Sequence, residues 1–357
     1  MSLETVIDLH IKNGAPAEMN YTGKDFSSDQ DVRWCPGCGD YTILKQVQTA
    51  MPEIGVKKED IVFISGIGCA ARFPYYMNTF GMHSIHGRAA AIATGLKISR
   101  PGLSVWVISG DGDSLSIGGN HFLHLLRRNV NINYLLFNNQ VYGLTKGQYS
   151  PTAPSGSVSK STPYGSIDHA VNPLSFALGA DGSFVARAMD RDPKHLNQMI
   201  LRASSHRGTS MLEIYQNCIV FNDGVFEKFT DKKSRPTEAI YLEHGQPLIF
   251  GEKNQKGVRI DGLTPKVVSL ENGEFSKDDL WIHDENDKTK AYMLSRFFDQ
   301  PKPGDEHRMP RPFGVLYAEN RPCYDDEVNR QIAGVVERKG VGNLDELLRG
   351  RETWTVE

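Results

Sequence analysis

The sequence of 357 residues contains neither a long run of apolar residues nor a long run of charge of one sign. No apolar stretch approaches the roughly 20 residues that a membrane-spanning helix needs, so no membrane partner is expected. The 40 basic and 43 acidic residues give a formal charge of −3, and this balance argues against nucleic acid as the main partner. The expected partners are therefore small molecules and other proteins.

Cysteine is also scarce, with five residues at uneven spacing. An odd and scattered set does not form the disulfide framework of a secreted protein. The first 14 residues lack the basic start and apolar stretch of a signal peptide. These two absences predict a cytoplasmic protein whose cysteines are reduced thiols or metal ligands.

No acidic residue lies between Asp60 and Asp111. The segment GIGCAA within this interval imitates a dinucleotide-binding fingerprint, but that fingerprint requires an acidic residue about 20 positions further on. A nicotinamide site is therefore not favoured. The interval is basic instead, and His86 and Arg88 open a predicted helix where anions are favoured. A zinc pair of His83 and His86 is the weaker alternative, because no third ligand stands out nearby.

Short β-branched segments alternate with helical ones from residue 60 to about 215. Continuous apolar strands between helices predict an α/β fold with a doubly wound, mostly parallel sheet. The predicted strands are 61–65, 104–109, 132–137 and 210–215, and the predicted helices are 87–99, about 116–128 and about 194–206.

Three regions are predicted along the chain. They are an N-terminal arm (1–33), a binding domain (34–224) and a C-terminal extension (225–357) that wraps over the core or a partner and contains a helix near 325–338. A stretch rich in Gly, Ser, Thr and Pro at 141–166 is too long for an ordinary connector and is a candidate binding loop.

Two polar motifs follow neighbouring predicted strands. Gly110-Asp111-Gly112 ends one strand, Asn138-Asn139 ends the next, and 25 residues separate Gly112 from Asn138. Ligands of such sheets bind at the carboxyl ends of the strands. Asp111, Asn139 and the carbonyl group of Val141 offer the oxygen ligands that Mg²⁺ prefers, and a helix starting near Ser116 would direct its N-terminus towards anions. Either motif alone is usually a turn, but together they resemble the diphosphate motif of thiamine-diphosphate enzymes.

The segment WCPGCG places Cys35 and Cys38 in a C-x-x-C pair. That spacing suits a redox disulfide, a zinc site or an iron–sulfur cluster. A redox disulfide leaves Cys69, at a strand end, and Cys218, just past the last strand, without a role. Zinc and a [4Fe–4S] cluster both accept four thiolates, and spacing alone does not separate them.

The order of the motifs WCPGCG, GIGC, HGRA, GDGD, NNQVYGLTKGQYSPT and QNCIVFN strongly resembles the β subunit of 2-oxoacid:ferredoxin oxidoreductases. The resemblance runs from Trp34 to Gly224, with a weaker echo in RPFGVLY and RPCYDDE. It implies a thiamine-diphosphate-binding fold in which Cys35, Cys38, Cys69 and Cys218 hold one [4Fe–4S] cluster. Cys323 is left over and is interpreted as structural. Iron–sulfur is favoured over zinc because zinc has no redox chemistry.

The resemblance also implies a reaction in which a 2-oxo acid, CoA and oxidised ferredoxin give acyl-CoA, CO₂ and reduced ferredoxin. The cofactors would be thiamine diphosphate, Mg²⁺ and the cluster. The candidates for the diphosphate surroundings are His86, Gly110, Gly112, Thr145 and Gln148. The glutamate that activates thiamine is not found in this chain and is expected from an α subunit, in an αβ or (αβ)₂ assembly.

Arg72 stands where the family places a basic residue that faces the substrate. An arginine can bind a carboxylate bidentately, which favours 2-oxoglutarate, and Leu144 and Lys146 are candidates for the rest of the pocket. A structural ion pair of Arg72 is the plain alternative, and pyruvate or a broad range of 2-oxo acids is the alternative specificity. Two other classes remain: a zinc-stapled diphosphate-binding structural or regulatory subunit, and a thiamine-dependent decarboxylase that uses neither CoA nor ferredoxin.

Overall fold

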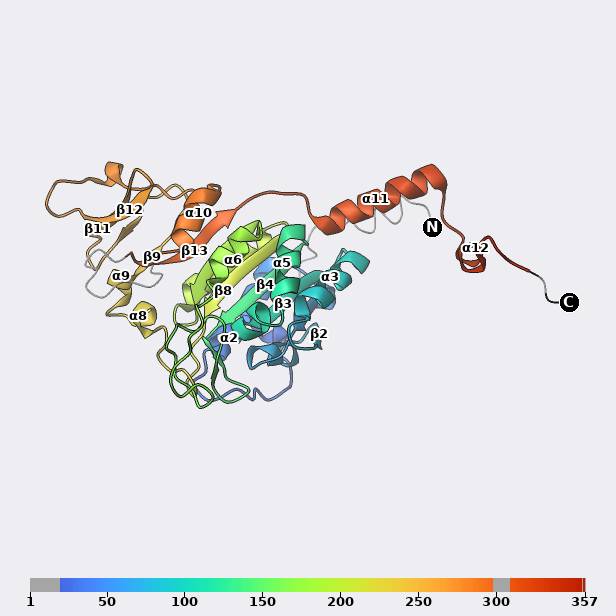
Figure 1. The fold of residues 1–357 in the computed structure, drawn as a ribbon, viewed down its shortest axis with the longest axis horizontal. Helices are drawn as coiled ribbons and strands as arrows, with labels where there is room; N and C mark the ends of the chain where they lie inside the picture. The colour runs from blue at the N-terminus through green and yellow to red at the C-terminus, as the bar shows by residue number, and fades with distance from the viewer. Residues whose placement is uncertain (1–19, 298–308, 355, 357) are drawn as a thin grey trace.

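The computed structural model describes residues 20–297, 309–354 and 356 (Figure 1). Most of the predicted N-terminal arm, and the segment on which the signal-peptide argument rests, lie outside the described residues. No helix in the described ranges is long and apolar enough to cross a membrane.

An eight-stranded sheet forms the centre of the molecule, in the order β2-β1-β3-β4-β8-β7-β13-β9. All neighbouring strands run parallel except β13 and β7, which are antiparallel. The predicted mostly parallel α/β sheet is therefore confirmed. The strands are β1 (Ile61–Ser65), β2 (Phe80–His83), β3 (Ser104–Gly110), β4 (Ile132–Asn138), β7 (Phe184–Met189), β8 (Thr209–Tyr215), β9 (Ala239–Tyr241) and β13 (Arg311–Ala318).

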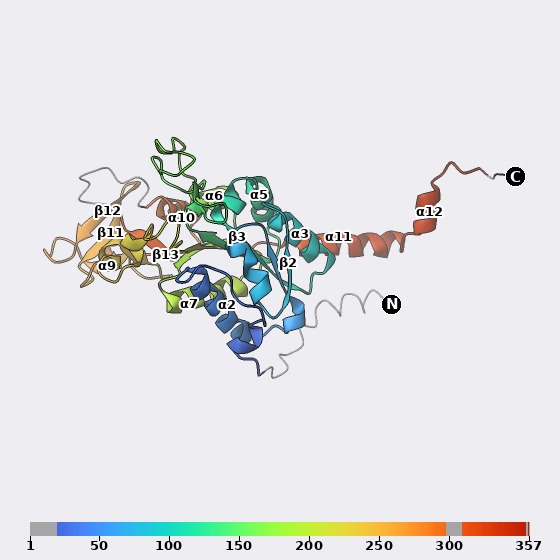
Figure 2. The same cartoon turned by 90° about the horizontal axis from the view of Figure 1, so that it is seen from below.

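Helices cover both faces of this sheet (Figure 2). On one face α2 (Asp40–Ile54) and α7 (Pro193–Ser205) pack on a core that includes Phe63, Trp106 and Leu135. On the other, α3 (Ala89–Ser99), α5 (Gly119–Arg128) and α6 (Pro173–Gly179) pack on a core that includes Val107 and Leu136. Because successive strand residues point to opposite faces, strands buried on both sides are apolar throughout.

The predicted start of a helix near Ser116 is wrong. A short helix, α4 (Asp111–Leu115), follows β3 directly, the backbone leaves helical geometry at Ser116, and α5 starts at Gly119. The break lies beside two glycines, which are weak helix formers. At Gly118 a Cβ atom would lie 2.2 Å from the carbonyl oxygen of Asp113, so the chain turns back tightly onto α4 here.

The predicted loop at 141–166 contains only a short hairpin of β5 (Val141–Tyr142) and β6 (Gln148–Tyr149). Short 3₁₀ helices lie elsewhere: η1 (Gly23–Phe26), η2 (Lys58–Asp60), η3 (Ala70–Tyr76) and η4 (Lys277–Asp279).

The C-terminal region contributes to the main sheet and also extends beyond it. Its β9 and β13 pair with one another, and β13 also pairs with β7. A separate antiparallel sheet holds β10 (Ile249–Phe250), β11 (Lys256–Asp261) and β12 (Thr264–Ser269), and the helices are α8 (Glu227–Thr230), α9 (Arg235–Glu238), α10 (Lys288–Ser295), α11 (Tyr324–Lys339) and α12 (Leu344–Arg349). The helix predicted near 325–338 is confirmed by α11, which together with α12 projects away from the body (Figure 1).

Candidate functional site

Asp111 and Asn138 lie at the carboxyl ends of the neighbouring strands β3 and β4. Oδ2 of Asp111 accepts hydrogen bonds from the hydroxyl groups of Ser150 and Thr152, both at 2.5 Å. The Thr152 hydroxyl also lies 3.0 Å from Oδ1 of Asn138. The long loop after β4 therefore folds back onto both strand ends.

Asp111 is a buried carboxylate without a protein cation. Its side chain belongs to a residue that is 2% exposed, and no basic side chain in the described ranges forms an ion pair with it. Burial raises the pKa of Asp111, against the lowering effect of the Ser150 and Thr152 hydroxyls. A buried negative charge of this kind is stabilised by a bound cation, and Mg²⁺ suits an oxygen donor set.

The turn after β4 holds Asn139 in a defined orientation. Its Oδ1 accepts a hydrogen bond from the backbone N–H of Val141 at 3.1 Å, and its Nδ2 donates to Oε1 of Gln216 at 2.8 Å. Gln140, between Asn139 and Val141, has a φ of +58°, in the left-handed region that non-glycine residues rarely adopt. A carbonyl oxygen has two lone pairs, so Oδ1 of Asn139 retains one for a metal ion.

The glycine and hydroxyl candidates of the predicted diphosphate site have partners within the chain. The ring of Tyr142 lies against Gly112, where a Cβ atom would come within 2.2 Å of it, and its hydroxyl donates to the Gly112 carbonyl at 3.3 Å. Gly110 is the residue before α4. The hydroxyl of Thr145 donates to Oε1 of Gln148 at 2.5 Å. The structure thus gives Gly112 a packing requirement that the sequence analysis did not foresee.

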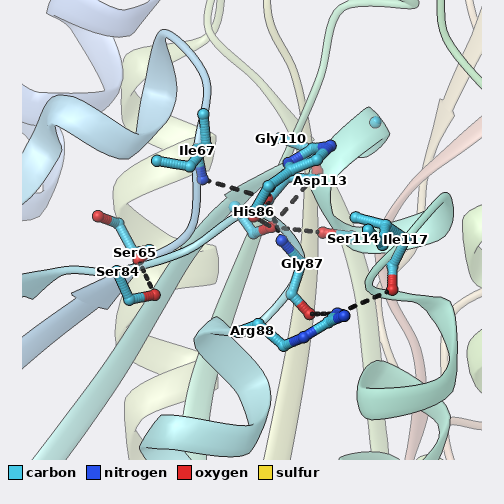
Figure 3. Close-up of polar contacts among 12 residues, drawn as sticks. Ser65, Ile67, Ser84, His86, Gly87, Arg88, Gly110, Asp113, Ser114 and Ile117 are labelled. Atoms are coloured by element: carbon cyan, nitrogen blue, oxygen red, sulfur yellow. Dashed lines mark hydrogen bonds and ion pairs between the residues drawn. The ribbon is translucent and has the colours of Figure 1, made fainter.

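Asp113, which the sequence analysis passed over, joins three strand-end segments (Figure 3). Its Oδ1 accepts hydrogen bonds from the backbone N–H of Ile67 at 3.1 Å and of Gly87 at 2.7 Å. Nδ1 of His86 lies 2.6 Å from the same oxygen, and the hydroxyl of Ser109 donates to Oδ2 at 2.6 Å. In the sequence this residue is visible only as the second aspartate of GDGD. Its partners Ile67, His86 and Gly87 lie far away in sequence.

These contacts fix the segments that carry His86. The His86 side chain is 38% exposed while that of Asp113 is 2% exposed. The imidazole is therefore held by a buried carboxylate and is itself accessible to solvent. His83 binds elsewhere, with Nδ1 2.8 Å from the carbonyl oxygen of Ala71. His83 and His86 therefore have separate partners. The described residues contain no group of three or more His, Cys, Asp or Glu side chains in metal-binding geometry.

The four candidate cluster cysteines come from three parts of the chain. Cys35 and Cys38 lie before α2, Cys69 precedes η3, and Cys218 follows β8. The sulfur atoms of Cys69 and Cys218 each lie 3.5 Å from the position that a Cβ atom on Gly143 would occupy. None of the five cysteines forms a disulfide, and Cys323 is buried apart from this group at the start of α11.

The environments of Cys38 and Cys69 differ from that of a redox-active thiol. Burial raises the pKa of Cys38, with a further rise from Asp40 and Cys218. Burial, Asp40, Cys218 and Cys35 raise the pKa of Cys69 to about 12. A redox-active thiol has a lowered pKa, whereas a bound metal deprotonates even a buried thiol.

Arg72 lies on η3 with its guanidinium available to a ligand. Its Nε donates to the Tyr76 hydroxyl at 3.0 Å, and the group lies 5.6 Å from the ring centroid of Tyr75. It is exposed, and it forms no ion pair with a carboxylate in the part of the chain that the structure describes. Leu144 is 53% exposed and Lys146 has a φ of +75° in the same loop as Gly143.

The GIGCAA segment does not form a dinucleotide site. The strand β1 leads through it into the 3₁₀ helix η3, so no α-helix N-terminus follows the glycines to receive a pyrophosphate. Gly66 serves another purpose, because a Cβ atom there would lie 1.9 Å from Oδ2 of Asp113.

This chain is similar to several known proteins. The family model "Thiamine pyrophosphate enzyme, C-terminal TPP binding domain" matches residues 66–214. The chain is 49% identical to the 2-oxoglutarate oxidoreductase subunit KorB of Mycobacterium tuberculosis, over 94% of this chain and 88% of that protein. It is 45% identical to a 2-oxoacid:ferredoxin oxidoreductase subunit beta of Sulfolobus, over 56% of this chain and 66% of that one.

A solved structure is similar along nearly the whole chain. It is the 2-oxoglutarate:ferredoxin oxidoreductase from Magnetococcus marinus with 2-oxoglutarate, coenzyme A and succinyl-CoA bound. The match has a TM-score of 0.70 and 34% identity, and it covers 92% of this chain and 94% of that chain.

Proposed function

Because this chain belongs to the β subunits of the 2-oxoglutarate:ferredoxin oxidoreductases, we propose that it acts with an α subunit to convert 2-oxoglutarate and CoA to succinyl-CoA and CO₂. Two electrons pass from the substrate to ferredoxin. This proposal is supported by the buried carboxylate of Asp111 together with the sulfur atoms of Cys69 and Cys218, which both lie beside Gly143, since a thiamine decarboxylase needs no cysteines.

Asp111, Asn139 and the carbonyl group of Val141 would hold Mg²⁺, and His86, Gly110, Gly112, Thr145 and Gln148 would surround the diphosphate. The burial of the Asp111 carboxylate, which forms no ion pair with a basic side chain among the described residues, supports this assignment. Thiamine diphosphate, when bound, supplies the electron sink for decarboxylation. The chain's own residues would bind and orient it, and Asp113 holds in place the segments that carry Ile67 and His86.

Cys35, Cys38, Cys69 and Cys218 would hold the [4Fe–4S] cluster. The convergence of Cys69 and Cys218 on Gly143 supports this donor set, because the same loop begins with Asn139 of the proposed metal site. The side chain of Gln216, which contacts both Asn139 and Cys38, supports the proposal that the two sites serve one reaction. A zinc-stapled subunit would have the same thiols but no path for electrons.

Arg72 is the proposed partner of the distal carboxylate of 2-oxoglutarate. Its guanidinium is positioned by Tyr76 and Tyr75 and makes no ion pair with a carboxylate among the described residues, which favours ligand binding over the structural ion pair. Leu144 and Lys146, on the loop beside Gly143, would complete the pocket. Pyruvate, or a broader range of 2-oxo acids, is the alternative substrate.

The α subunit would supply the glutamate that activates thiamine, in an αβ or (αβ)₂ assembly in the cytoplasm. The test is to purify the chain with its partner without oxygen. Iron, acid-labile sulfide and zinc are then measured, and ferredoxin reduction is followed with 2-oxoglutarate with and without CoA.

We expect about four irons and four sulfides per β subunit, little zinc, and ferredoxin reduction that requires CoA. One zinc without sulfide would overturn the proposal in favour of a structural subunit. Release of CO₂ without CoA or ferredoxin would indicate a decarboxylase instead.

A further inference from the structure

Gln216 connects the proposed metal site to the cysteines. It follows β8 directly and is 1% exposed. Its Oε1 accepts a hydrogen bond from Nδ2 of Asn139 at 2.8 Å. Its Nε2 donates to the sulfur of Cys38 at 3.1 Å and to the carbonyl oxygen of Asn217 at 2.7 Å. One side chain therefore contacts a candidate Mg²⁺ ligand and a candidate cluster ligand.

The direction of these hydrogen bonds is fixed at both ends by the backbone. The N–H of Val141 can only donate, so it turns Oδ1 of Asn139 towards itself and Nδ2 towards Gln216. The carbonyl group of Asn217 can only accept, so it takes Nε2 of Gln216. Cys38 consequently faces an amide N–H group and not an amide oxygen.

Backbone and side-chain contacts hold Gln216 and its neighbours in place. The N–H of Gln216 donates to the carbonyl oxygen of Asn138 at 2.9 Å. Nδ2 of Asn222 donates to the carbonyl oxygen of Asn139 at 2.9 Å. The N–H of Gly39, next to Cys38, donates to the carbonyl oxygen of Asn217 at 3.1 Å. The segment after β8 is thus fastened to the turn after β4 on one side and to the C-x-x-C loop on the other.

We propose that Gln216 is a positioning residue that serves both sites: it orients Asn139 for the metal ion and donates an N–H hydrogen bond to the Cys38 sulfur. The inference rests on the proposed function, since it concerns residues assigned there to Mg²⁺ and to the cluster. An N–H donor stabilises the extra negative charge that a thiolate-bound cluster gains on reduction, so it raises the reduction potential. Partners of this kind also set the affinity of a metal site.

Two substitutions separate these two effects. Gln216→Leu removes both the acceptor for Asn139 and the donor for Cys38. Gln216→Glu keeps an oxygen acceptor for Asn139 but removes the N–H donor to Cys38 and adds a negative charge. A matched control is Gln48→Leu, because Gln48 is also buried, at 7% exposed, and donates through Nε2 to the carbonyl oxygen of Tyr76 at 3.2 Å.

The measurements use the complete enzyme with its α subunit. The reduction potential of the cluster is followed by electron paramagnetic resonance during a redox titration, and the apparent Mg²⁺ dissociation constant is measured from thiamine diphosphate binding. For Gln216→Leu we expect a more negative potential and a dissociation constant raised by about 10-fold or more. For Gln216→Glu we expect the more negative potential with a dissociation constant close to that of the unchanged enzyme.

The role of Gln216 would be overturned, and the proposed function would stand, if an enzyme that binds its cluster changed neither its reduction potential nor its Mg²⁺ dissociation constant by more than Gln48→Leu does. If the enzyme without substitutions contained no iron, or did not bind thiamine diphosphate in a Mg²⁺-dependent way, the proposed function would be overturned, and the inference with it. Gln216→Glu is nearly isosteric, so it provides the potential measurement even if Gln216→Leu fails to fold.

Discussion

Nδ1 of His86 lies 2.6 Å from Oδ1 of Asp113, and this contact joins the segment after β2 to the first turn of α4. The same carboxylate also receives two backbone N–H groups and a serine hydroxyl. A buried carboxyl group is costly to leave without hydrogen-bond partners, and these contacts satisfy it. Asp113 therefore stabilises the floor of the proposed site.

Gly66→Ala is expected to displace this carboxylate. The added Cβ atom would lie 1.9 Å from Oδ2 of Asp113, and overpacking at a fixed site costs about 1–3 kcal/mol. We expect the free energy of unfolding to fall by that amount, measured by urea denaturation, together with weaker binding of thiamine diphosphate.

The matched control is Gly95→Ala in the middle of α3, where a Cβ atom would meet nothing within 4 Å. Alanine is the better helix former, so this change is expected to raise the free energy of unfolding by about 0.5–1 kcal/mol. Equal effects of the two substitutions would contradict the tight contact at Gly66.

Arg72→Leu is expected to reduce kcat/KM for 2-oxoglutarate by about 10- to 150-fold, because hydrogen bonds to a charged group contribute about 1.5–3 kcal/mol. The value for pyruvate, which has no distal carboxylate, should change little. Steady-state reduction of ferredoxin with each substrate measures the ratio. The control is Arg128→Leu, since Arg128 also lies 5.6 Å from a tyrosine ring centroid, that of Tyr324. An unchanged substrate preference would remove the role of Arg72.

Arg187 and Glu213 form a fully buried ion pair, with Nε 2.6 Å from Oε2 and both side chains 1% exposed. Glu213→Leu alone should lower the free energy of unfolding by about 3–5 kcal/mol, because it removes the carboxylate that pairs with the buried Arg187 guanidinium. Arg187→Met with Glu213→Leu should cost clearly less than the sum of the two single changes. Additive costs in a urea double-mutant cycle would contradict a direct coupling.

His206 makes the stability of the chain dependent on acid. Burial, with a smaller effect of Arg321, lowers its pKa from 6.5 to about 4. Between about pH 4 and pH 6.5 the imidazole of His206 binds a proton in the unfolded chain but not in the folded chain. The stabilisation that His206 contributes is therefore complete above about pH 6.5 and is lost as the pH falls towards 4. His206→Gln should flatten the pH dependence of the free energy of unfolding between about pH 5 and 7. Parallel curves for the two proteins would show that His206 does not carry it.

The sequence was sufficient to place Asp111 and Asn139 at neighbouring strand ends, because apolar strands between helices imply a parallel sheet and its carboxyl ends share one edge. It was not sufficient to recognise Asp113. The donors to that carboxylate, Ile67 and Gly87, come from loops whose meeting depends on the whole sheet. Local pattern also missed the break at Ser116, since the close approach of Gly118 to α4 is a tertiary contact.

The strand β13 was missed for a related reason. Its sequence contains Pro312 and Gly314, both of which are unfavourable in strands, and Gly314 has a φ of +122°. The backbone of Gly314 passes so close to Leu242 that a Cβ atom would lie 2.8 Å from its carbonyl oxygen. The glycine that argues against a strand is thus what lets the strand fit beside its neighbour.

The position of β13 has a consequence for how the protein is made. It covers the edge of β7 and pairs with β9, yet it comes long after β7 in the chain. Until β13 has been synthesised, this edge of β7 has no partner from its own chain, and an open edge can pair with another unfinished chain. A transcript truncated before codon 311 would release a product that carries all four candidate cluster cysteines but keeps this edge uncovered.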